Sequence, residues 1–177
     1  MNSRRHFLKF TAGASLTLLA PSTLAKINPI PERRLQFYHL HTGEKLTATY
    51  WQDGHYIAEQ LDSINHLLRD HRSGELATMD KNLLDLLFAL QKSLDHKGAY
   101  QIISAYRSPK TNAMLRNKSN GVAKRSLHMQ GKAIDIRLAG ANLKDLRRAA
   151  IDLQAGGVGY YTKSDFIHVD TGRPRYW

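Results

Sequence analysis

The hydrophobic positions of the chain recur with two periods, and each period predicts a different kind of element. Residues 35–41 and 45–51 are typical of two strands joined by a tight turn. Apolar residues three or four positions apart over 57–68 predict a helix. A second helix is predicted to begin after Asp80 as its N-cap and to stop at Gly98. The N-terminal half therefore predicts a hairpin followed by two helices.

The C-terminal half combines short strands with short helices. Ser108 and Pro109 are typical of an N-cap and a first helical residue, and they predict a helix that runs to about residue 117. Asn142 is predicted to cap another helix that ends at Leu153. The predicted strands cover 100–106, 133–138, 156–161 and 166–170. These elements predict an α+β fold, a single domain in which helices flank an antiparallel sheet.

The stretch SLHMQGKAIDIR at 126–137 raises the question of a metal site. His128 stands seven positions before Asp135. In a random chain of this composition, such a spacing is expected about 0.5 times, so the spacing alone is weak evidence. Gly131 between them can turn the chain, and the alternation that follows places Asp135 on the polar face of a half-buried strand. His128 can then fold back over Asp135.

The stretch DFIHVD at 165–170 offers a third ligand. Alternation along this strand places His168 on the same face as Asp170. Because the chain has no cysteine, a zinc ion must be held by histidines and carboxylates. Two histidines and one carboxylate leave a fourth position for water, as in catalytic zinc sites. Asp165, in the turn before the strand, is predicted to serve as general base toward that water.

Other polar and aromatic residues have two interpretations each. Asp170 is a candidate either to hold the imidazole of His168 or to pair with Arg107. His39 and His41 could chelate a metal, but no third partner lies near them in the sequence, so a structural role is favoured. Several aromatic residues could line a peptide groove or pack in the core. They are Tyr106, Tyr160, Tyr161 and those of the terminal RPRYW.

The N-terminus and the charge bear on location. Residues 1–25 have the basic start, short apolar run and small-residue end of an export signal, and SRRHFLK resembles a twin-arginine signal. An uncleaved membrane anchor is the alternative. Cleavage after Ala25 would leave a mature chain, 26–177, whose formal charge is +8 instead of +11. Such a basic protein is expected to meet anionic cell wall, although scattered basic residues are equally typical of a solvated surface. Nucleic acid is not expected as a partner, since no basic motif with interleaved aromatic residues is present.

Taken together, the two motifs resemble those of the LAS metallopeptidases, which include D-alanyl-D-alanine carboxypeptidases and dipeptidases and a murein endopeptidase branch that matches best. The resemblance covers about 35–170. It is carried by S-x-H-x-x-G-x-A-x-D (Ser126, His128, Gly131, Ala133, Asp135), by D-x-x-H-x-D (Asp165, His168, Asp170) and by YRSPKTN at 106–112.

The resemblance implies one zinc ion held by His128, Asp135 and His168. It further implies Asp165 as catalytic acid/base and Arg107 as the residue that stabilises the oxyanion. Some relatives carry glutamate or a further histidine in the last motif, and Asp165 of this chain has a shorter side chain than glutamate. Ser126 could contact substrate or only form a turn.

The implied function is a periplasmic, monomeric murein endopeptidase that cleaves peptide cross-links, either D-alanyl-diaminopimelate or diaminopimelate-diaminopimelate. A carboxypeptidase or dipeptidase that trims stem peptides, and a non-catalytic wall-binding module, remain alternatives. No stable insertion into the membrane is expected once the signal is removed.

Overall fold

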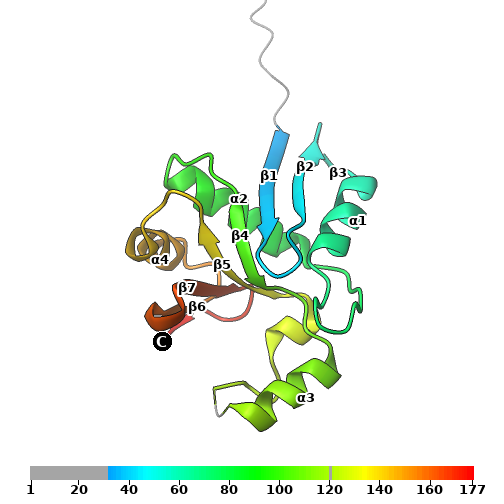
Figure 1. The fold of residues 1–177 in the computed structure, drawn as a ribbon. Coiled ribbons are helices and arrows are strands. Elements are labelled where there is room, and N and C mark those ends of the chain that lie inside the picture. Colours follow the sequence, from blue (N-terminus) through cyan, green and yellow to red (C-terminus); the bar gives the residue numbers. More distant parts are fainter. Residues whose placement is uncertain (1–31, 120) are drawn as a thin grey trace, which may run out of the picture.

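A computed structural model describes residues 32–119 and 121–177 (Figure 1). The predicted export signal at 1–25 lies outside the described residues. Within the described ranges, no helix is long and apolar enough to cross a bilayer. The described part of the chain forms one domain.

One mixed sheet of eight strands organises this domain, in the order β3-β2-β1-β4-β5-β7-β6-β8 (Figure 1). The centre of the sheet lies at β4, β5 and β7, which pair with one another in antiparallel fashion. The strands are β1 Glu32–His39, β2 Lys45–Gln52, β3 His55–Tyr56, β4 Tyr100–Ser104, β5 Ala133–Leu138, β6 Gly157–Tyr161, β7 Phe166–Asp170 and β8 Arg175–Tyr176.

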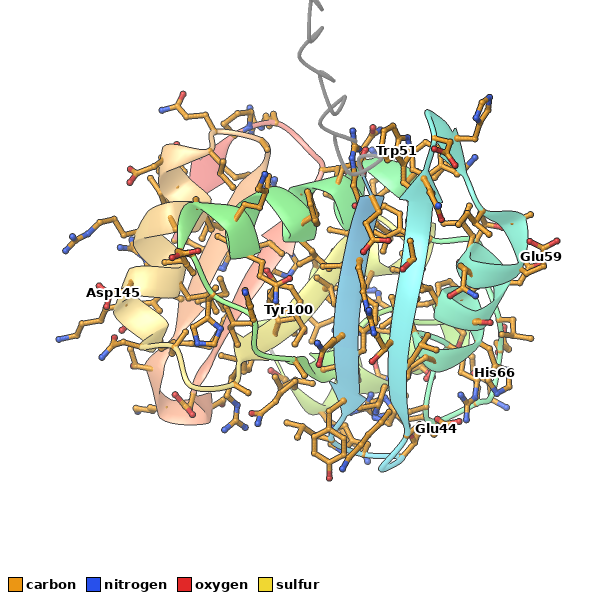
Figure 2. The ribbon with its side chains drawn as sticks, turned by 90° about the horizontal axis from the view of Figure 1, so that it is seen from above. Glu44, Trp51, Glu59, His66, Tyr100 and Asp145 are labelled. Atoms are coloured by element: carbon orange, nitrogen blue, oxygen red, sulfur yellow. The ribbon has the colours of Figure 1, made fainter. Side chains whose placement is uncertain are left out.

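The described residues form four α-helices, α1 Ala58–Leu67, α2 Lys81–Ser93, α3 Pro109–Lys118 and α4 Leu143–Asp152. α1 packs on β2, α2 packs on β1, and α4 packs on β5, β6 and β7. The core lies between the sheet and these helices, where Tyr100 is fully buried and its hydroxyl donates to the carbonyl oxygen of Leu87 at 2.7 Å (Figure 2). α3 lies apart from the other helices, beyond one end of the sheet (Figure 1).

The predicted helix starts are confirmed by the capping contacts. An oxygen of the Asp80 side chain accepts from the backbone N–H of Asn82 at 3.0 Å. Ser108 caps α3, with Pro109 as its first residue, and Asn142 caps α4. The predicted end of α2 at Gly98 is wrong, because the helix ends at Ser93 and the chain then turns through a left-handed conformation at Asp95 (φ 46°).

Five of the seven strand pairings in the sheet are antiparallel, as the sequence predicts, and two are parallel. β1 pairs in parallel with β4 because α1 and α2 cross over between them, and β6 pairs in parallel with β8. The prediction that β5 is half-buried is also wrong. Five of the six residues of β5 are buried, with Asp135 7% exposed and Ile134 and Ile136 fully buried, and only Arg137 is partly exposed.

Candidate metal centre

Three side chains from separate segments converge beside the central strands. His128 comes from the 3-10 helix η1 (Leu127–Gln130), Asp135 from β5 and His168 from β7. Asp135 and His168 face each other in the register of the two strands. Nε2 of His128 lies 3.2 Å from Nδ1 of His168 and 3.3 Å from Oδ1 of Asp135, and Nδ1 of His168 lies 2.9 Å from the same Oδ1.

These separations fit a tetrahedral metal ion. With metal–ligand bonds of about 2.0–2.2 Å, the ligand atoms of such a site lie roughly 3.3–3.6 Å apart. Each of the three residues offers one ligand atom, and these atoms lie within 4.8 Å of one another. The convergence that the two sequence motifs predicted is therefore present, and the nature of the atoms suits zinc.

The orientation of His128 follows from its backbone surroundings. Nδ1 of His128 donates to the carbonyl oxygen of Ala105 at 2.7 Å, which leaves the lone pair of Nε2 facing the centre. Gly131 follows η1 with a φ of 66°, and a Cβ there would meet the carbonyl oxygen of Thr78 at 2.4 Å. Gly131 is thus required for the turn that brings His128 over Asp135, as the sequence indicated.

His168 is held from its other ring nitrogen by Asp170. Nε2 of His168 lies 2.9 Å from Oδ2 of Asp170, so Nδ1 is the atom presented to the centre. Asp170 is fully buried and accepts from the backbone N–H groups of Gly157 and Gly172. It also forms a two-pronged ion pair with Arg175, at 2.6 and 3.0 Å. Of the two interpretations of Asp170, the contact with His168 is the one observed, and the arginine that pairs with it is Arg175 rather than Arg107.

The electrostatics of the centre favour a cation. Burial alone would raise the pKa of Asp135, but the adjacent His128 and His168 hold it well below its usual range. Burial would lower the pKa of His168, whereas its hydrogen bonds to Asp135 and Asp170 raise it. The buried carboxylates thus favour positive charge at this position. A divalent cation would supply positive charge to the same carboxylates.

The centre opens into a pocket of about 480 Å³ that contains further predicted residues. Arg107 lines this pocket, with Nη2 3.7 Å from Oδ2 of Asp135 and 3.5 Å from the hydroxyl of Ser104. Nε of Arg107 is buried and has no hydrogen-bond partner among the described residues. Ser126 is buried and also lines the pocket. The structure thus brings Arg107 and Ser126 to the centre.

Asp165 lies elsewhere. It stands in a left-handed turn (φ 51°) between the 3-10 helix η2 (Thr162–Ser164) and β7, and its side chain is 62% exposed. Its Oδ2 accepts from Arg137 at 2.9 Å, and Asp165 is not among the residues that line the pocket. The structure therefore does not place Asp165 where the predicted general base has to stand. The sequence could not show this, because the direction of a side chain in a turn depends on a local φ and on a partner in another strand.

Aromatic residues form another wall of the pocket. The ring of Trp177 lies 5.3 Å from that of His168, and its indole N–H donates to the Tyr161 hydroxyl at 2.9 Å. Tyr161 stacks on Phe166 with ring centroids 4.6 Å apart. Groove lining is thus the role of Tyr161 and of the terminal Trp177, while Tyr106 and Tyr160 pack against the core. Phe166 was predicted to share the face of His168 and Arg175 lies within the terminal RPRYW, but neither was assigned a specific role at this site from the sequence.

A buried centre of two histidines and one carboxylate, open to a pocket on one side, is typical of a catalytic rather than a structural metal site. Residues 28–177 match the family model described as peptidoglycan L,D-endopeptidase MepK, and the chain belongs to this family. It is 39% identical over 178 residues to the peptidoglycan L,D-endopeptidase MepK of Escherichia coli strain K12, covering 99% of the chain and 98% of that relative.

A second relative supports the same assignment. The probable peptidoglycan L,D-endopeptidase MepK of Haemophilus influenzae is 40% identical over 163 residues, which cover 92% of the chain and 88% of that protein. The predicted membership of the LAS peptidase group, in its murein endopeptidase branch, is thereby confirmed.

Proposed function

We propose that the protein is a zinc-dependent murein endopeptidase that hydrolyses an L,D peptide bond in cross-linked peptidoglycan. The observation that carries the proposal is the convergence of His128, Asp135 and His168 beneath an open pocket. The relatives, which are named as peptidoglycan L,D-endopeptidases, support the choice of substrate. Of the two cross-links considered, the one between two diaminopimelates joins an L centre to a D centre, so it is the bond proposed here.

The metal ligands in this proposal are Nε2 of His128, Oδ1 of Asp135 and Nδ1 of His168. A zinc ion held there would lower the pKa of a bound water to about 7 and polarise the scissile carbonyl. Arg107 keeps its charge in this buried position, and its guanidinium faces the pocket next to Asp135. We propose that Arg107 stabilises the negative charge that develops on the carbonyl oxygen. One well-placed donor of this kind lowers the free energy of the transition state by about 3–4 kcal/mol.

The predicted general base, Asp165, does not line the pocket. Asp165 was expected to take the proton of the attacking water, but its carboxylate pairs with Arg137 at the surface. Among the described residues that line the pocket, Asp135 is the one carboxylate, and it is a metal ligand. Zinc, when bound, would reduce the need for a strong base toward the attacking water, while the proton that the water loses must still reach the leaving amine. The role of Asp165 as general base stays a prediction.

The proposal includes a location. We infer that residues 1–25 direct export, that the twin-arginine route carries the folded protein, and that residues 26–177 act as a monomer in the periplasm. The arginine pair at positions 4 and 5 and the apolar run that follows support this inference. Peptidoglycan is the polymer that such a location offers.

The test uses purified protein, one equivalent of zinc and defined cross-linked muropeptides, with products identified by mass spectrometry. We expect separated stem peptides, loss of activity with a chelator, and no activity in His128→Ala. Release of free amino acids instead would indicate a carboxypeptidase, and salt-sensitive binding to sacculi without any product would indicate a wall-binding module.

The same assay with Asp165→Asn decides the predicted base. Its exposed position predicts activity within a few-fold of the wild type. A decrease of 100-fold or more, with zinc content unchanged, would restore Asp165 as general base.

A further inference from the structure

One wall of the pocket comes from a segment that contains no acidic residue. Between His96 and Ile134 the chain has eight lysines and arginines and neither aspartate nor glutamate, whereas the whole chain has 26 basic and 15 acidic residues. This segment includes α3, the loop after it and η1, and Figure 1 shows α3 standing out beyond the sheet. Two of these eight basic residues, Arg107 and Arg125, line the pocket of the metal centre.

Three arginines line the pocket, and two of them are already engaged. Arg175 is neutralised by the fully buried Asp170. Arg107 lies 3.7 Å from a metal ligand, Asp135, in the position assigned to the carbonyl oxygen. Arg125 is exposed and takes part in none of the ion pairs within residues 32–119 and 121–177. Arg125 is thus the cation of the pocket that remains available to a ligand.

The chemistry of the proposed substrate supplies a matching anion. In a cross-link between diaminopimelates, the carbon that bears the scissile nitrogen also bears a free carboxylate. A bound substrate therefore places a negative charge next to the bond that is cut, within the space that the pocket encloses. An arginine suits this partner better than a lysine because its planar guanidinium can hold both carboxylate oxygens.

We propose that Arg125 is a specificity-determining residue that pairs with the free carboxylate on the leaving-group side of the scissile bond. The proposal rests on the proposed function and deepens it. It explains why the enzyme would act at a cross-link whose amine side carries a carboxylate, and why this wall of the pocket excludes aspartate and glutamate. The remaining lysines and arginines of the segment contribute only a diffuse attraction that salt screens.

The test compares two synthetic substrates that differ in one group, the free carboxylate or its carboxamide, in the wild type and in Arg125→Gln. For the wild type we expect kcat/KM on the carboxamide to be roughly 10- to 100-fold lower than on the carboxylate, the range for one charged hydrogen-bonded contact. Arg125→Gln should lose about the same factor on the carboxylate substrate and little on the carboxamide. Arg125→Lys should recover part of the loss.

Lys124→Gln is the matched control, since it removes a neighbouring exposed charge that does not line the pocket. Equal losses in Arg125→Gln on both substrates, or equal effects of Arg125→Gln and Lys124→Gln, would overturn the pairing. Zinc content, measured for each variant, should not change. If the wild type hydrolyses neither substrate, the proposed function itself fails, and that outcome is distinct from a wild type that hydrolyses both equally well.

Discussion

Single residues around His168 show how much of the centre depends on groups that do not touch the metal position. Asp170 accepts from His168, from two backbone N–H groups and from both terminal nitrogens of Arg175. A Cβ at Gly157 would lie 2.4 Å from Nη1 of Arg175 and 2.5 Å from Oδ2 of Asp170. Gly157 is therefore required for the ion pair between Asp170 and Arg175. This ion pair holds the His168 ring in the orientation that directs its Nδ1 toward the centre.

This arrangement predicts that Arg175→Met weakens metal binding. Without its arginine, Asp170 stays buried with unmet acceptor capacity, and His168 is no longer held in one orientation. We expect the zinc affinity to fall by about 10- to 100-fold, the usual effect of losing such a supporting contact. Competition with a chromophoric chelator measures this affinity directly and without turnover.

Arg69→Met is a suitable control, because Arg69 pairs with Glu44 outside the centre at 3.0 Å. Arg69→Met should leave the affinity for zinc unchanged. Arg175→Lys should recover part of the affinity that Arg175→Met loses. An unchanged affinity in folded Arg175→Met would show that Asp170 alone orients His168.

At the level of single residues, the sequence predicted the convergence of His128, Asp135 and His168 because each belongs to a motif with fixed spacing. Arg175 could not be predicted in the same way. It reaches Asp170 only because the short strand β8 pairs in parallel with β6, and a two-residue strand has no periodic pattern. Asp165 was predicted from the motif alone, and a turn at positive φ directs its side chain toward Arg137.

Among the elements, the end of β1 and the segment after α1 are joined by three histidines. The rings of His41 and His71 are stacked at 4.3 Å, and His39, which is fully buried, lies 5.4 Å from His71. Next to His71, Asp70 accepts from the backbone N–H of Ser108 at 2.9 Å. Ser108 caps α3 and directly follows Arg107, so the histidine cluster supports the segment that positions the pocket arginine.

This contact predicts a loss of stability in mild acid. Burial, followed by Arg72 and the neighbouring histidines, lowers the pKa of His71 to about 4, and burial followed by His41 lowers that of His39. Glu44 and Asp70 oppose these shifts only in part. Between pH 6.5 and 4 the unfolded chain binds protons that the folded chain does not, so the free energy of unfolding decreases as the pH falls.

The measurement is the urea midpoint at pH 7.0 and 4.5, with chelator present so that metal release does not contribute. Between pH 7.0 and 4.5, we expect the free energy of unfolding to decrease by about 1 kcal/mol less in His71→Gln than in the wild type. This value is smaller than the full effect of the pKa shift because His71 is partly exposed to solvent. His66→Gln, an exposed control, should behave as the wild type does. The carboxyls of Asp70 and Asp170 have a pKa well below the usual range and do not titrate in this window. If the free energy of unfolding decreased equally in the wild type, His71→Gln and His66→Gln, the histidine cluster would not be the cause of the acid sensitivity.

The elements themselves were predictable to different degrees. Three of the four helices begin at the residues that capping chemistry indicated, because Asp80, Ser108 and Asn142 act on their own local backbone. The parallel pairing of β1 with β4 depends on where two helices place the returning chain, which no local pattern reports. The burial of Asp135 on β5 has the same origin, since the segments that pack on this strand, η1 and α4, come from other parts of the chain.

At the scale of the whole molecule, the centre brings together His128 and His168, which are 40 residues apart in the sequence, beside the neighbouring strands β5 and β7. His128 reaches the centre from η1, while Asp135 and His168 belong to strands that the sheet already pairs. Without a metal, two imidazoles and a carboxylate are packed within 3.3 Å of one another in a buried site. A ligand that binds only the folded chain must then stabilise it as a whole.

Zinc is therefore expected to raise the melting temperature of the entire domain. At a free zinc concentration 100-fold above the dissociation constant, the gain is about 2.7 kcal/mol, which corresponds to roughly 5–10 °C for a domain of this size. Differential scanning calorimetry with zinc and with chelator measures the shift. His128→Ala should lose most of it, because the ion keeps two ligands instead of three, and Arg125→Gln should keep all of it because Arg125 binds substrate and not metal. A shift of equal size in His128→Ala would mean that zinc stabilises the protein from another site, and the centre described here would lose its principal support.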